Sequence, residues 1–89
     1  MAGMVGMNVE EVRQLSRQME NVAQQIEQAA RQITSVMGST TWKGNDYINF
    51  EGNWQSQHMS AINQVVNALR DASKTADRNA TDQEQVSNA

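Results

Sequence analysis

Residues 9–37 read VEEVRQLSRQMENVAQQIEQAARQITSVM and give the clearest signal for a fold. The apolar residues of this stretch recur at alternating spacings of three and four, which is the repeat of an a/d heptad seam on an α-helix. The residues of this first stripe are Val12, Leu15, Met19, Val22, Ile26, Ala29, Ile33 and Val36. A second stripe, one heptad between members, runs beside it and consists of Val9, Ser16, Ala23, Ala30 and Met37. Two adjacent stripes make a face wider than one partner helix covers, which is typical of a helix bundle.

Both ends of this helix carry sequence signals. Asn8 followed by Glu11 fits a capping box, in which the Asn side chain accepts a hydrogen bond from an early backbone N–H. Gly38 is expected to supply a left-handed residue just after the last turn. We therefore predict a flexible N-terminus over 1–7, a helix over 8–37 and a turn over 38–44.

A second helical pattern begins after the turn, and we predict a helix over 45–78. Asn45 or Asp46 is expected to cap its start. Its stripe steps by three or four through Tyr47, Phe50, Trp54, His58, Ala61, Val65, Leu69, Ala72 and Ala76, and a companion stripe holds Ile48, Met59, Ile62 and Val66. Since Val86 is the one sizeable apolar residue beyond this pattern, residues 79–89 are predicted to form a flexible tail.

The fold class that follows is all-α: an antiparallel helix-turn-helix hairpin that dimerises into a four-helix bundle. The chain has 89 residues, no cysteine, and only two Trp, one Tyr and one Phe, so its own core is small and no disulfide supports it. We therefore expect the chain to be stabilised by association with another chain, in either a homodimer or a heterodimer. The predicted dimer and hairpin core is Val12, Leu15, Met19, Val22, Ile26, Ile33, Phe50, Trp54, Ile62, Val65 and Leu69.

Composition excludes several classes of function. The net charge of −3 with no basic stripe argues against nucleic-acid binding. No apolar run is long enough for a transmembrane segment, and the first residues lack the basic region of a cleaved signal peptide. With one His, no Cys and no paired catalytic side chains, we expect no enzyme activity, no metal site and no cofactor.

The turn between the helices reads Trp42-Lys43-Gly44. Glycine permits the backbone conformation that reverses the chain, and the large indole ring can cover the end of the hairpin. A Trp-Xaa-Gly turn in the middle of a short, two-helix chain resembles the WXG family of Esx-type small proteins. The resemblance covers roughly residues 8–82. It implies a protein of a bacterial type VII secretion system, secreted without a cleaved signal peptide and paired with another chain in a four-helix bundle.

The chain departs from that family at its C-terminal end. Members that carry the export signal have a Tyr four residues before an acidic residue, whereas here Arg78 stands four residues before Asp82. By resemblance, this chain is the signal-less subunit of a heterodimer. Its expected partners are a second WXG protein with the Tyr-xxx-Asp/Glu tail and the secretion ATPase. The alternative is a cytosolic helical adaptor or homodimeric coiled-coil module that is not exported.

Overall fold

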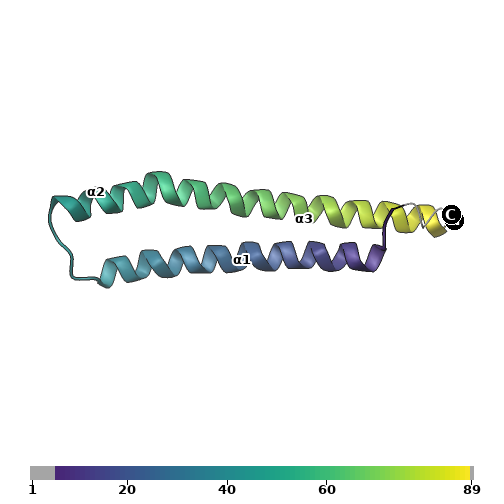
Figure 1. Ribbon diagram of the computed structural model, residues 1–89, viewed down its shortest axis with the longest axis horizontal. Helices are drawn as coiled ribbons and strands as arrows, with labels where there is room; N and C mark the ends of the chain where they lie inside the picture. Colours follow the sequence, from purple (N-terminus) through teal and green to yellow (C-terminus); the bar gives the residue numbers. More distant parts are fainter. Residues whose placement is uncertain (1–5, 89) are drawn as a thin grey trace.

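The computed structural model describes residues 6–88 and contains no strand among them. Helix α1 (Val9–Ser39) leads through a short turn to α2 (Asn45–Asn53), and a π-helical segment, η2 (Trp54–His58), joins α2 to α3 (Met59–Asn88) without a break. The second, longer rod runs back antiparallel to α1, as Figure 1 shows. The molecule measures 66 × 18 × 14 Å along its principal axes. The prediction of an all-α antiparallel hairpin is confirmed.

Helix α1 begins as predicted and ends later than predicted. The side chain of Asn8 accepts a hydrogen bond of 3.0 Å from the backbone N–H of Glu11, so the predicted N-cap is confirmed. Gly38 as a left-handed cap is wrong, because α1 continues through it and it has no positive φ. The chain instead leaves the helix at Thr40, which is extended and whose N–H bonds the carbonyl of Met37.

The turn reverses the chain at Gly44, as the Trp-Xaa-Gly sequence predicts. Its φ of 105° lies in the region that favours glycine, because a side chain there would clash with the backbone. Gly44 is also the N-cap of α2, and it offers no side-chain hydrogen bond. The prediction of Asn45 or Asp46 as the cap is therefore wrong, since both already lie in the first turn of the helix.

The second helix extends further than the sequence predicts. Helix α3 continues to Asn88 through most of the predicted tail, 79–89, whose last residue lies outside the described chain. One reason is Ala80, which is 0% exposed and packs against α1, so the contact between the helices does not stop where the large apolar residues end. Of the predicted flexible N-terminus, 1–7, residues 1–5 lie outside the described chain.

Small residues form the buried seam between α1 and α3. Its members are Ser16, Ala23 and Ala30 on α1 and Val66, Ser73 and Ala80 on α3, which we call the seam. On each helix they recur every seven residues, and small side chains let two helix backbones approach closely. Ser16 and Ser73 lock the register, because each hydroxyl lies 2.8–2.9 Å from the backbone carbonyl of the other residue.

The seam differs from the predicted core, since it follows the second stripe of α1 and not the first. Of the predicted core residues, those exposed in the hairpin are Leu15, Val22, Ile33, Phe50 and Val65. Those half-buried at the border of the seam are Val12, Met19, Ile26, Trp54, Ile62 and Leu69. The larger residues cannot lie between the helices without forcing them apart, so they turn to the flank. Whether they meet a second chain stays a prediction.

The π-helical segment explains why the predicted stripe of the second helix fails midway. The N–H of Met59 bonds the carbonyl of Trp54, five residues earlier, which inserts one extra residue into the helical turn. Trp54 and Met59 are both half-buried as a result, and the side facing α1 shifts by one position. His58, the last residue of the segment, is exposed, and beyond it Val65 is exposed while Val66 lies in the seam.

Candidate interaction face

One flank of the hairpin carries most of its large exposed aliphatic residues. On α1 the apolar residues of this flank form two stripes, each with members one heptad apart, and on α3 two matching stripes lie alongside. We call this set the apolar face: Val12, Leu15, Met19, Val22, Ile26, Ala29, Ile33, Val36, Ile62, Val65, Leu69, Ala72 and Ala76. None of them is fully buried, and Leu15, Ile33, Val36 and Val65 are each about half exposed, at 47–53%. The hairpin alone therefore leaves this face in contact with water.

The opposite flank holds the two helices together with ion pairs. Arg70 donates two hydrogen bonds to Glu27, of 2.8 and 3.0 Å, and one of 3.2 Å to Glu20. Arg13 donates two to Glu84, of 2.9 and 3.2 Å. We call these five residues the ion-paired flank. The hydrogen bonds from the guanidinium groups are the main reason that the pKa values of Glu27 and Glu84 lie below the ordinary carboxyl value.

The geometry of an antiparallel pair explains why polar and apolar residues separate in this way. Successive helical residues are rotated by about 100°, so residues four after a seam position lie on one flank and residues three after it on the other. Arg70 is four after Val66 and Glu20 four after Ser16, which places both on the ion-paired flank. Residues three after a seam position, such as Met19 and Leu69, belong to the apolar face.

Charge is correspondingly scarce around the apolar face. Among the charged residues of α1 and α3, only Glu11 and Asp82 fall on its outer margin by helical position, both at the end of the hairpin near the termini. The margin of α1 continues with the amides Gln18, Gln25 and Gln32. This flank thus offers a long uncharged surface, with polar groups confined to its borders.

The turn carries an aromatic cluster. The ring of Trp42 lies 5.4 Å from that of Tyr47 and 5.1 Å from that of Phe50, in tilted arrangements typical of aromatic pairs. Trp42 and Phe50 remain 40% and 46% exposed. Trp42, predicted to cover the end of the hairpin, packs on α2 in this way, while Gly44 sets the reversal. A hydrogen bond from Tyr47 to Glu51 is the main cause of the raised pKa of the tyrosine.

Trp54 ties the second helix to α1 close to the turn. Its indole N–H donates a hydrogen bond of 2.8 Å to the hydroxyl of Thr34, while its ring lies 6.2 Å from that of His58. The single histidine therefore sits beside an aromatic ring. Among the residues that the structure describes, no group of three or more His, Asp or Glu side chains is placed to hold a metal ion.

The two residues singled out at the predicted export tail lie on α3 itself. Arg78 and Asp82 are both exposed and helical, one turn apart. By helical position Asp82 is at the margin of the apolar face, whereas Arg78 points toward the ion-paired side. Sequence reasoning missed the seam of α3 and the ion-paired flank. The seven-residue recurrence of Val66, Ser73 and Ala80 was the available signal for the former.

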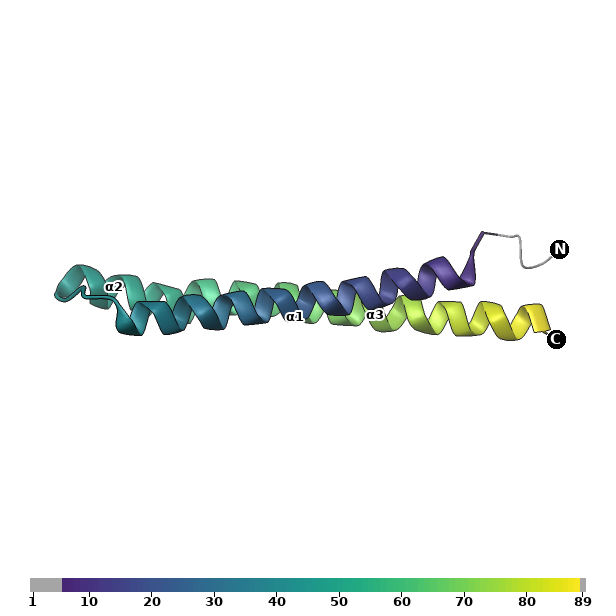
Figure 2. The ribbon, with the colours of Figure 1, turned by 90° about the horizontal axis from the view of Figure 1, so that it is seen from below.

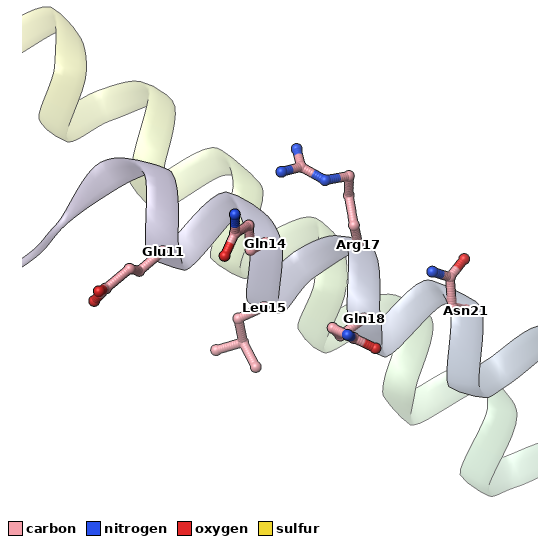
Figure 3. A pocket seen from close by; sticks show the side chains of 6 residues that line it. All are labelled: Glu11, Gln14, Leu15, Arg17, Gln18 and Asn21. Carbon is pink, nitrogen blue, oxygen red and sulfur yellow. The ribbon is translucent and has the colours of Figure 1, made fainter.

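A shallow depression lies on the outer surface of α1. Figure 3 shows its lining, which consists of Glu11, Gln14, Leu15, Arg17, Gln18 and Asn21. All six side chains come from one helix and spread to both sides of it, so the depression is a furrow of the helix surface and does not enclose a ligand. Within the described chain, no helix combines the length and apolar character needed to cross a lipid bilayer.

Comparison with known proteins adds no assignment, since no family model, curated protein or solved structure matches the chain. The fold and its surface define the class: an amphipathic helical hairpin that is ion-paired along one flank and apolar along the other.

Proposed function

We propose that this chain is a non-enzymatic interaction protein that pairs through its apolar face with a second helical hairpin, giving a four-helix bundle. The observation that carries the proposal is the uncharged surface along one flank of both helices. Exposed apolar surface on this scale usually marks a site of protein association.

The size of the apolar face supports the proposal. From Val12 to Val36 the face runs about 36 Å along α1, at 1.5 Å per residue. On α3 it runs about 21 Å, from Ile62 to Ala76. With a width of about 10 Å for each helix, the area of the face is roughly 570 Å². Such an area lies at the upper end of the range for the largest apolar patch of a typical monomer, about 300–600 Å². It is somewhat smaller than the roughly 800 Å² that each partner contributes to a standard interface.

The proposal also names the family of this chain and of its partner. The Trp42-Lys43-Gly44 turn, with its reversal at Gly44, supports membership of the WXG group of type VII secretion substrates. In this proposal the chain is exported without a cleaved signal peptide. Because Arg78 occupies the place of the tail tyrosine, the chain is the signal-less subunit. A second WXG protein with the Tyr-xxx-Asp/Glu tail pairs with it and engages the secretion ATPase.

A matched pair of substitutions tests the pairing surface. Val22 on the apolar face and Gln24, two residues further along the same helix, are both exposed, so the hairpin tolerates a carboxylate at either position. In a four-helix bundle Val22→Asp places an unpaired charge in the interface, whereas Gln24→Asp stays in water. We expect Val22→Asp to abolish association with the tail-bearing partner in sedimentation velocity runs, and Gln24→Asp to leave it unchanged. Equal association by both variants would contradict the proposal.

Export is tested separately in a strain with a type VII system. The wild-type chain should reach the medium only when the tail-bearing partner is co-expressed, because an arginine offers no ring to dock in an apolar pocket. Arg78→Tyr should permit some export without the partner. Full export of the wild-type chain alone would show that it carries its own signal. Sedimentation of the chain alone as a dimer, with no export under any condition, would favour the homodimeric adaptor.

A further inference from the structure

The C-terminal turns of α3 project beyond the start of α1. Ser16 lies opposite Ser73 through their reciprocal hydrogen bonds, so in an antiparallel pair Val9 is level with Ala80. Because α1 begins at Val9, the helix after Ala80 extends past it, as Figures 1 and 2 show. We call residues 81–88 the overhang.

The overhang has little apolar support. Ala80, at 0% exposed, is the last residue of the seam, and Val86 is 59% exposed. The last carbonyl groups of any helix lack partners within it, so a terminal segment without packing tends to fray. Thr81 and Gln83 are half-buried all the same, so polar contacts are what hold this overhang to the rest of the hairpin.

Arg13 provides such a contact from one turn inside α1. Its two terminal nitrogens donate to the two carboxylate oxygens of Glu84, at 2.9 and 3.2 Å, and one of them also lies 3.4 Å from the hydroxyl of Thr81. This fork is the geometry in which a guanidinium binds a carboxylate most strongly. Among the described residues, it is also the salt bridge that joins the overhang to α1.

The surroundings of Arg13 favour a contact that can be broken and reformed. Arg13 is part-exposed and Glu84 is about half exposed, with side-chain values of 23% and 48%, so water reaches the pair. Asp77 and Glu10 also stabilise the charge of Arg13, so the guanidinium keeps acidic neighbours when Glu84 moves away. Exposed ion pairs contribute little to global stability, but at a helix end the same small energy shifts a local helix–coil balance.

We propose that Arg13 is a latch: its contact with Glu84 keeps the overhang helical against α1, and loss of that contact releases residues 81–88 as an extended arm that carries Asp82. This inference goes beyond the proposed function, in which the export signal lies on the partner's tail and not on this chain's. A helical overhang presents Asp82 on a rigid surface, whereas a released arm presents it on an extended chain. The latch thereby sets how often Asp82 is presented in each form.

Hydrogen exchange of backbone amides, measured on the purified chain, tests the latch. Arg13→Gln should raise the exchange rates of the overhang by about two- to fivefold, the range expected for loss of an exposed ion pair. Exchange in the seam should stay unchanged. Arg17→Gln is the matched control, because it removes the same charge one turn along the same helix, where Arg17 forms no salt bridge with a described residue.

The charge-swapped pair, Arg13→Glu with Glu84→Arg, should restore slow exchange, since it rebuilds the ion pair in reverse. Unchanged exchange in Arg13→Gln would overturn the latch. So would an equal rise throughout the hairpin, or an equal rise in Arg17→Gln, because either shows a general effect of charge. These measurements need no secretion system. If the exchange rates contradict the latch, the export proposal still stands. If the exchange rates are as expected but the chain is not exported, only the export proposal is contradicted.

Discussion

Two adjacent valines of α3 give a direct test of which residues form the hairpin's own core. Val66 is 1% exposed in the seam, whereas Val65 is 50% exposed on the apolar face. Val66→Ala and Val65→Ala delete the same atoms from neighbouring positions of one helix and change helix propensity equally. A difference between their free energies of unfolding therefore reports the difference in burial.

The expected magnitudes follow from that burial. Each substitution removes two methylene-sized groups, and full burial of one such group contributes about 0.8 kcal/mol. At Val66 the lost transfer free energy is thus about 1.6 kcal/mol. The cavity left between the helices increases the expected loss to about 2–3 kcal/mol. At Val65, which is half exposed, the loss is about 0.8 kcal/mol with no enclosed cavity. The better helix propensity of alanine offsets a similar few tenths in both variants.

Urea unfolding followed by circular dichroism measures the difference. The titrations should be run at several protein concentrations and extrapolated to high dilution, so that association through the apolar face does not contribute. We expect Val66→Ala to lower the midpoint clearly, and Val65→Ala to have a smaller effect in the isolated chain while weakening binding of the second hairpin. Equal losses, or a larger loss at Val65, would refute the assignment of the seam.

Three further predictions concern single contacts. Trp54→Phe removes the hydrogen bond to Thr34 and should cost about 0.5–1.5 kcal/mol in urea unfolding; a double-mutant cycle with Thr34→Val that shows no coupling would contradict that contact. At Gly44 an added Cβ would have no neighbouring atom within 4 Å, but an alanine there must adopt a φ of 105°. We therefore expect Gly44→Ala to lower the free energy of unfolding by about 1–2 kcal/mol, and an unchanged free energy would exclude this backbone conformation. Hydrogen bonds from Arg70 lower the pKa of Glu27, so its stabilising contribution is present above the unfolded value of 4.5 and is lost as the pH falls through the lower folded value. Glu27→Gln should therefore make the urea midpoint fall less as the pH is lowered. An unchanged pH dependence would show that the ion pair of Glu27 with Arg70 does not contribute to it.

Much of the fold can be predicted from the sequence. The spacing of Val12 to Val36 predicts a long helix, and Asn8 with Glu11 predicts where it starts, because both signals depend only on local helical geometry. The short connection that ends at Gly44 requires the second helix to return antiparallel. The same local reasoning failed at Gly38, whose glycine allows a left-handed cap but does not require one.

The candidate site was predicted only in part. The spacing of the first stripe of α1 predicts an apolar surface, which the structure shows, but it also predicts that these residues pack within the hairpin, where they are exposed or only half-buried. In the second helix, a stripe drawn with a constant period crosses from Trp54, which faces α1, to the exposed Val65. The π-helical turn at Met59 causes this change, and no sequence rule that assumes an unbroken α-helix can place it.

Two long amphipathic helices, their antiparallel return and several neighbouring stripes on each helix follow from the order of residues along the chain. Which stripe turns inward follows only from the packing of the two helices. Helical periodicity is the same for every stripe, so it cannot rank a row of Ser and Ala against a row of Val, Leu and Ile. The choice depends on how closely two backbones approach and on contacts between residues far apart in the chain, such as Ser16 with Ser73 and Arg70 with Glu27. Those contacts favour the small residues inside and leave the large apolar ones exposed on the face where we propose that a second hairpin binds.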